Sequence, residues 1–147
     1  MNHPAIARLG RRIAYRNPWI RVEEHDIRFG PKGRRMTYGF VVASPSVSIV
    51  AVTLRKKVVL VRQYRYPTRG YNWELPGGGA GGLRPVLAAR KELEEETGYR
   101  AGRLRKLGHY VVYSGLSNEI CHVFLATNLR RGRQNLEETE HLTVHEV

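Results

Sequence analysis

The chain has 147 residues, a length that suits one domain with a single hydrophobic core. Hydrophobic residues make up 41% of the sequence, which argues against a disordered chain, and no apolar run approaches the ~20 residues that cross a bilayer. Lysine and arginine outnumber aspartate and glutamate by 25 to 13, so the formal net charge is +12 and the chain attracts anions. The basic residues are scattered, which favours a solvated basic surface and leaves nucleic acid open as a partner.

The sequence gives two indications about the compartment. No apolar segment follows the arginines near the start of the chain, so we expect no signal peptide and a cytoplasmic location. Cys121 is the only cysteine and cannot form an internal disulfide. Its apolar neighbours predict a buried strand residue in preference to a nucleophile.

The first half of the chain has the patterns of β-strands. The glycine- and proline-containing turn at 30–33 indicates a hairpin, and the runs on either side of Arg55 and Lys56 are apolar enough to be buried on both faces. A glycine-rich loop is expected at 76–82. The predicted strands are residues 19–29, 34–43, 47–54, 57–64 and 72–75.

A change of period predicts one helix over residues 85–97, with Pro85 in its first turn and Gly98 as its C-terminal cap. Further strands are expected at 104–112, 120–127 and 142–147, with a basic turn at 130–133. The order of elements predicts an α+β or α/β sandwich, a mixed β-sheet with the helix packed on it. We expect a single domain over residues 1–147, in which residues 1–45 form an N-terminal hairpin region.

Three carboxylates of this helix share one side of it. At ~100° per residue, Glu96 falls roughly 40° and Glu95 roughly −60° from Glu92, whereas Glu94 points away. Leu93, Ala89, Val86 and Thr97 form the adjoining face, which is expected to pack on the core. Like charges at this spacing destabilise a helix. Hard oxygen ligands at this density suit Mg²⁺ or Mn²⁺. The alternative is an acidic solvated face, and the glycine-rich loop before the helix favours the metal.

Residues 77–99 resemble the Nudix box, in which Gly77 begins the motif and Lys91-Glu92-Leu93-Glu94-Glu95-Glu96-Thr97-Gly98-Tyr99 ends it. Lys91 stands where the box has arginine, and Leu83 stands where counting from Gly77 places a first glutamate. The Glu-x-x-Glu-Glu core is retained. The resemblance therefore implies a Nudix fold and metal-dependent hydrolysis of a diphosphate.

The same resemblance implies roles for individual residues. Glu92, Glu95 and Glu96 would bind Mg²⁺, with the carbonyl oxygen of Gly77 as a further ligand. Glu95 and Glu96 would be catalytic, with Glu95 also the candidate base.

The flanking segments 47–52, 58–67 and 73–76 resemble the ADP-ribose and nucleoside-diphosphate-sugar pyrophosphatase branch of the family. This implies that Arg65 contacts substrate phosphates, although a surface arginine at a strand end is the alternative. Glu74 would orient the substrate, with a salt-bridge partner as its alternative. Glu119, in the loop at 113–119, would approach the attacking water as a secondary catalytic candidate.

Assembly expectations also follow from the branch. Its N-terminal hairpin commonly builds a homodimer, and further residues usually follow the last strand. Trp19 and Tyr38 could stack on a base, although core or interface packing is favoured.

The expected function is Mg²⁺-dependent hydrolysis of a pyrophosphate bond in a nucleoside diphosphate linked to a sugar, giving a nucleoside monophosphate and a sugar phosphate. Two alternatives remain open. One is a Nudix hydrolase of dinucleoside polyphosphates or RNA 5′ ends, which the +12 charge supports. The other is a nucleotide-binding module with little turnover, which Lys91 and Leu83 motivate.

Overall fold

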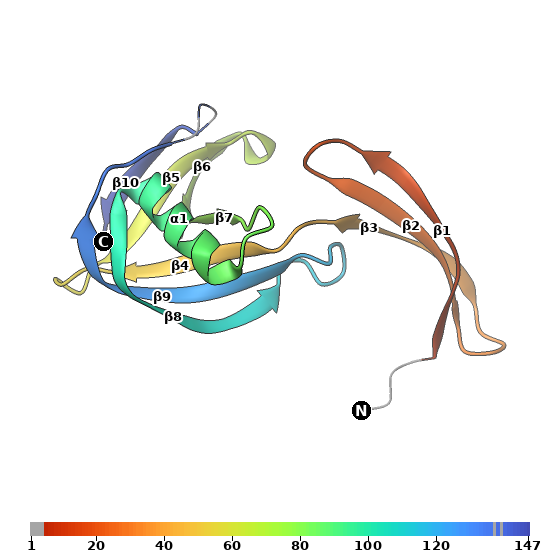
Figure 1. The fold of residues 1–147 in the computed structure, drawn as a ribbon. Coiled ribbons are helices and arrows are strands. Elements are labelled where there is room, and N and C mark those ends of the chain that lie inside the picture. Colours follow the sequence, from red (N-terminus) through yellow and green to blue (C-terminus); the bar gives the residue numbers. More distant parts are fainter. Residues whose placement is uncertain (1–4, 137, 139) are drawn as a thin grey trace. The chain divides into compact units, whose positions relative to one another are not determined.

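Ten strands, a short 3₁₀ helix and one α-helix lie within residues 5–136, 138 and 140–147, the part of the chain that the computed structural model describes (Figure 1). In chain order they are β1 Ile6–Arg16, β2 Arg21–Phe29, β3 Arg35–Val42, β4 Ser46–Val52, β5 Val58–Arg65, η1 Tyr66–Thr68, β6 Gly70–Glu74, β7 Gly77–Gly79, α1 Pro85–Thr97, β8 Tyr99–Val111, β9 Ile120–Arg131 and β10 Leu142–Glu146.

The chain divides into two compact units. The first contains the chain up to Ala43 together with Val111–Glu119, and the second contains Ser44–Tyr110 and Ile120–Val147. The first division falls close to residue 45, where the predicted N-terminal region ends. That residues 1–147 act as one domain stays a prediction.

The first unit is built on an antiparallel sheet in the order β1-β2-β3. The predicted hairpin is confirmed as β2 and β3. Strand β1 was not predicted, because register shifts between Arg8 and Gly10 and between Ile13 and Tyr15 break its alternation of apolar and polar residues. The 111–119 segment joins this sheet through Val41, which donates to the Leu116 carbonyl at 2.8 Å and forms a parallel bridge with Ser117.

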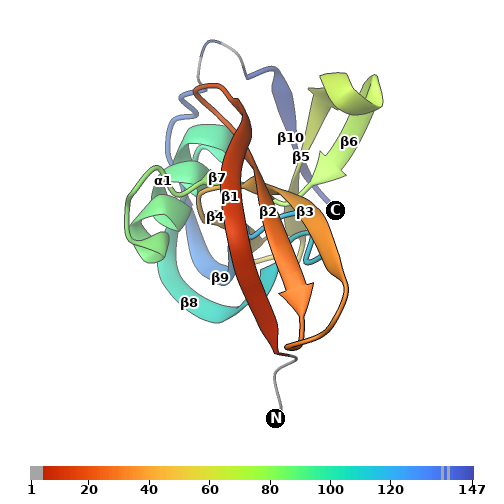
Figure 2. The same cartoon turned by 90° about the vertical axis from the view of Figure 1, so that its right-hand side faces the viewer.

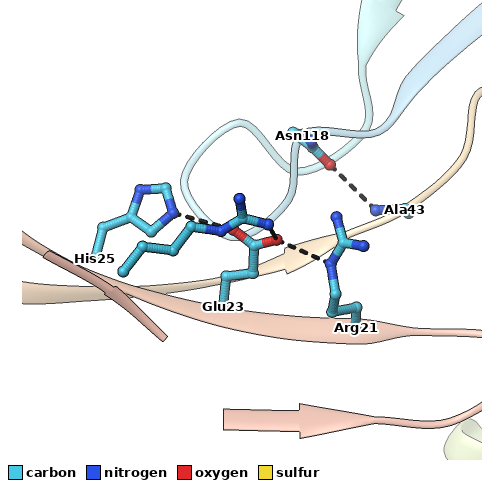
Figure 3. Close-up of polar contacts among 6 residues, drawn as sticks. Arg21, Glu23, His25, Ala43 and Asn118 are labelled. Carbon is cyan, nitrogen blue, oxygen red and sulfur yellow. Dashed lines mark hydrogen bonds and ion pairs between the residues drawn. The ribbon is translucent and has the colours of Figure 1, made fainter. Parts of the chain in front are cut away.

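A buried carboxylate lies at the centre of this sheet. Glu23 is 3% exposed, and Figure 3 shows it between Arg21 and His25 on the same strand. Arg11 donates to it at 2.6 Å, Arg21 lies at 2.8 Å and the His25 ring at 3.0 Å. The hydrogen bond from Arg11 is the largest cause that holds the pKa of Glu23 at about 2, well below its usual 4.5. Charge pairing therefore makes the burial of this carboxylate tolerable.

The second unit contains a mixed sheet in the order β10-β5-β4-β9-β8. Strands β4 and β9 pair in parallel, whereas β5 pairs antiparallel with β4 and β10. Only the start of β5 pairs with β4; further along, the same edge of β5 pairs with β6. The vacated edge of β4 pairs with the short strand β7. This departure of β5 from β4 makes room for β7 beside the helix.

Helix α1 begins at Pro85 and ends at Thr97, as predicted, and Gly98 caps it with φ 69° and a 2.8 Å hydrogen bond to the Glu94 carbonyl. It packs against β7 and β4. Its Ala88, Ala89 and Leu93 join a core that includes Ile49 and Val59, all at most 1% exposed. No helix among the described residues is long and apolar enough to span a membrane.

Several local predictions were wrong. The segment 76–82 contains strand β7 in place of a continuous loop, and β9 runs to Arg131 through the predicted basic turn. Val86 is 37% exposed, whereas Ala88 takes its place in the core. The prediction for Cys121 is confirmed, since it lies in β9 and is 4% exposed.

Candidate active site

Among the described residues of the second unit, the most buried carboxylate is that of Glu96, on the last turn of α1 and 4% exposed. It accepts a hydrogen bond of 2.7 Å from the backbone N–H of Gly77. The pKa of Glu96 is raised to about 7, chiefly by burial and also by the charge of Glu92, while the Gly77 hydrogen bond lowers it. A carboxylate in this position favours a nearby cation.

The helical wheel explains why Glu96 is buried. It lies beside the face that carries Ala89 and Leu93, so the packing of those residues on the core takes Glu96 with it. Glu92 is half-buried, whereas Glu94 faces away and pairs with Arg100 at 2.6 Å. The sequence therefore places the carboxylates in different surroundings on one short helix.

The glycines of β7 let the backbone approach this helix. A side chain at Gly77 would collide with the Val47 carbonyl oxygen. A Cβ at Gly78 would lie 2.6 Å from Oε2 of Glu92, so the Glu92 carboxylate rests directly on the strand. The pairing of Val47 with Gly78 and of Ser48 with Gly77 holds β7 in place. The structure thus brings Gly77, Glu92 and Glu96 close together, with the Gly77 N–H rather than its carbonyl in contact with Glu96, and their binding of a metal stays a prediction.

Glu95 is placed differently. Its carboxylate accepts a hydrogen bond of 2.7 Å from Lys91, one turn earlier on the helix. A cavity of about 210 Å³ lies on this side of α1 and is lined by Lys91, Glu94, Glu95, Arg133 and Asn135. Lys91 therefore contacts one oxygen of the carboxylate that the resemblance assigns to the metal.

The segment after β9 braces the end of the helix, which sequence reasoning missed. Gln134 donates to the Glu96 carbonyl at 2.6 Å, and the Asn135 N–H donates to the Glu95 carbonyl at 2.9 Å. Gly132 likewise donates to the Gly98 carbonyl. These contacts join residues more than thirty positions apart, and no local pattern in the sequence predicts them.

The surroundings of Glu96 and Glu92 fit a divalent cation. A buried carboxylate with a raised pKa beside a second carboxylate is stabilised by positive charge, and oxygen donors are those that Mg²⁺ prefers. Within the described ranges, no three or more His, Cys, Asp or Glu side chains form a ready-made metal site. Binding of a cation by all of Glu92, Glu95 and Glu96 therefore stays a prediction.

The two predicted substrate-binding residues contact one another. Arg65, at the end of β5, donates two hydrogen bonds to Glu74 on β6, at 2.9 and 2.6 Å. These bonds raise the pKa of Arg65, and the charge of Glu96 adds to the effect. Arg65 therefore lies within electrostatic reach of the buried carboxylate. The salt bridge is the alternative left open for Glu74.

Glu119 belongs to the first unit. It is half-buried, and its backbone N–H donates to the Ser117 hydroxyl at 3.1 Å. Tyr38, in the same unit, donates from its hydroxyl to the Gly115 carbonyl at 2.8 Å, and Trp19 is 83% exposed. The catalytic role of Glu119 stays a prediction.

Known proteins similar to this chain share both sequence and fold. An ADP-ribose pyrophosphatase of Bacillus subtilis is 37% identical over 120 residues, covering 80% of this chain and 65% of that protein. A methanol dehydrogenase activator of Bacillus methanolicus is 30% identical over 131 residues, covering 87% and 70%. The chain thus spans just under two thirds of the length of the first relative.

The crystal structure of an ADP compounds hydrolase aligns with 99% of this chain and with 78% of the hydrolase chain, at 23% sequence identity. The TM-score of 0.84 shows that the two proteins share the fold. A family model described as the NUDIX domain matches residues 42–147, which include β7, α1 and the glutamates beside them. This confirms the fold class that was predicted, a mixed sheet carrying the Nudix-box helix. The chain belongs to the Nudix family.

Proposed function

We propose that the protein hydrolyses the pyrophosphate bond of a nucleoside diphosphate linked to a sugar, with ADP-ribose as the representative substrate, and that it requires Mg²⁺. The products are a nucleoside monophosphate and a sugar phosphate. The observation that carries the proposal is the buried Glu96 carboxylate, placed beside Glu92, against β7 and within reach of the charge of Arg65. Relatives named for ADP-ribose and ADP-sugar hydrolysis support this substrate class.

The residues would divide the work as follows. Glu92, Glu95 and Glu96 would hold Mg²⁺, with Mn²⁺ as a substitute, and Glu95 would keep Lys91 on one of its two carboxylate oxygens. The ion would neutralise the diphosphate and lower the pKa of a bound water. Glu95 is the candidate base, and Glu119 is the secondary candidate. Arg65 has a planar guanidinium suited to phosphate oxygens, and Glu74 fixes its orientation.

The test is a substrate panel with Mg²⁺, containing ADP-ribose, NADH, a dinucleoside polyphosphate and triphosphorylated RNA. The proposal expects ADP-ribose to be the best substrate, with Glu96→Gln lowering turnover about a hundredfold or more. Glu94→Gln is the matched control, because Glu94 lies on the same helix but pairs with Arg100. It should keep turnover near the wild-type rate.

Other outcomes would replace this proposal. Best activity on the polyphosphate or on RNA would move the substrate to the alternative that the +12 charge supports. Nucleotide binding without hydrolysis, whichever divalent metal is added, would indicate a binding module. The Lys91–Glu95 pair is the observation that favours this last reading.

A further inference from the structure

Strands β10, β5 and β6 lie side by side and present one continuous face (Figures 1 and 2). Cross-strand partners in antiparallel pairs project to the same side of a sheet. Arg62 is opposite Trp73 on β6 and Thr143 on β10. We call this surface the aromatic face; it consists of Leu60, Arg62, Tyr64, Tyr71, Trp73, Thr143 and His145.

The aromatic rings of this face are exposed, and each contacts a neighbouring ring or Arg62. Tyr71 is 61% exposed, Trp73 53% and Tyr64 45%. The Tyr64 and Tyr71 rings meet edge to face at 5.6 Å, and the Trp73 and His145 rings at 4.7 Å. The guanidinium of Arg62 lies 4.7 Å from the centre of the Tyr71 ring and 5.9 Å from that of Trp73. Flat apolar surfaces are therefore held open to solvent around a cation.

The aromatic face is separate from the candidate active site. Val59, Val61 and Gln63 project from the opposite side of β5 and are buried. Arg65 and Glu74, the ion pair assigned to the substrate, also lie on that opposite side, since Val61 is the cross-strand partner of Glu74. The proposed hydrolysis thus leaves these aromatic side chains without a role.

The charge of the face favours a polyanion. None of its residues is acidic, Arg62 is cationic, and the chain as a whole has a net charge of +12 and an isoelectric point of about 10.4. A second copy of this chain carries the same charge and would bring Arg62 towards further cations. A nucleic acid complements the face better, because its phosphates are attracted to the protein.

We propose that the aromatic face binds single-stranded nucleic acid. Unpaired bases stack on exposed aromatic rings and on arginine, and open sheet faces carrying such rings are a known form of single-strand binding. In this arrangement Tyr71, Trp73 and Tyr64 stack on bases, and Arg62 contributes stacking and charge. Duplexes keep their bases inside the stack and gain only the charge term.

The test is fluorescence anisotropy of labelled single-stranded oligothymidine and oligouridine, about 12 nucleotides long, titrated with the whole chain at several salt concentrations. Tyr71→Ala should weaken binding at least about fivefold, the loss of one base stack. Tyr71→Phe keeps the ring and should bind as the wild type does. Tyr113→Ala removes a similarly exposed tyrosine from the first unit and should leave the affinity for the oligonucleotides unchanged.

The salt dependence tests the electrostatic part. Arg62→Gln should reduce the steepness of log affinity against log salt by about 0.7, the value for one phosphate contact on a single strand. Arg105→Gln, which removes one exposed arginine of β8, should leave the steepness as in the wild type.

Four results would overturn the proposal. These are equal affinity for a duplex of the same length, wild-type affinity in Tyr71→Ala and Arg62→Gln, no measurable binding at about 50 mM salt, and a stable wild-type dimer by light scattering that Tyr71→Ala dissociates. The last result would show that a second copy covers the face. If Tyr71→Ala fails to fold, the affinity and salt dependence of Arg62→Gln decide whether the proposal holds.

Discussion

At the scale of single residues, burial disfavours the charged form of Glu96, whereas Glu94 has a cationic partner. Glu96 is buried and its pKa is about 7, whereas Glu94 is paired with Arg100 near the surface. Because its folded-state pKa lies above the usual 4.5, protonated Glu96 stabilises the fold fully below pH 4.5, and this contribution is lost as the pH rises through 7. A neutral side chain at position 96 would avoid this loss of stability.

Glu96→Gln is therefore expected to melt at or above the wild-type temperature in metal-free buffer at about pH 8, because the buried charge is gone and the amide oxygen still accepts from Gly77. Glu94→Gln is expected to melt at or slightly below it, since a surface pair contributes about 0–1 kcal/mol. Differential scanning calorimetry measures both. A Glu96→Gln variant much less stable than Glu94→Gln would contradict this account of Glu96.

Arg65 depends on the geometry of its guanidinium. Arg65→Lys keeps the positive charge but loses the paired hydrogen bonds that Glu74 now accepts. We expect KM for ADP-ribose to rise about tenfold, with a smaller change in kcat, because the group binds phosphates in ground and transition states alike. Steady-state kinetics measures this. A kcat loss with unchanged KM would place Arg65 in the chemical step instead.

At the scale of elements, the contact between β7 and α1 sets the position of Glu92. In Gly78→Ala the new Cβ would lie 2.6 Å from Oε2 of Glu92, whereas a Cβ at Gly79 meets nothing within 4 Å. Gly78→Ala is expected to lower Mg²⁺-dependent turnover about 10–100-fold, as displaced metal-site partners do, while Gly79→Ala stays near wild type. Equal rates in the two variants would show that Glu92 need not rest on β7.

The predictability of the elements follows from where their signals lie. Helix α1 was predicted to the residue, because Pro85 and Gly98 mark its ends locally. Strand β7 was missed, because three glycines carry no strand pattern and pair only when β5 vacates the edge of β4. Ala88 is in the core in place of Val86 because packing, and not hydrophobicity alone, decides which face of the helix turns inward.

The site follows the same rule. Gly77, Glu92 and Glu96 were predicted from one continuous motif and lie together. Lys91 binding Glu95 and the bracing by Gln134 and Asn135 depend on rotamers and on distant segments, which the sequence alone does not specify. The aromatic face was missed although residues 62–73 interleave arginines with aromatic residues, because the pairing of β5 with β6 and β10 decides which of them share one side of the sheet.

At the scale of the whole molecule, the dependence of stability on pH comes from Glu23 of the first unit as well as from Glu96 of the second. Arg11, His25 and Arg21 hold the pKa of Glu23 at about 2, below its usual 4.5. The stabilisation from ionised Glu23 is therefore fully present above pH 4.5 and is lost as the pH falls towards 2.

Glu23→Gln should consequently be less stable than the wild type near neutral pH, and the difference should shrink as the pH falls below 4.5. Thermal melts followed by circular dichroism at a series of pH values provide the comparison. A difference that stays constant down to the acid limit would show that the charge of Glu23 does not matter for the first unit.

The proposed hydrolysis depends on a divalent cation bound by Glu92, Glu95 and Glu96. Electron paramagnetic resonance of Mn²⁺ titrated into the protein, with and without a nucleotide, measures that binding directly. The account predicts bound Mn²⁺ in the wild type and in Glu94→Gln, and affinity reduced at least about tenfold in Glu92→Gln and in Glu96→Gln. Equal Mn²⁺ binding by all four proteins, or none by any of them with nucleotide present, would contradict it.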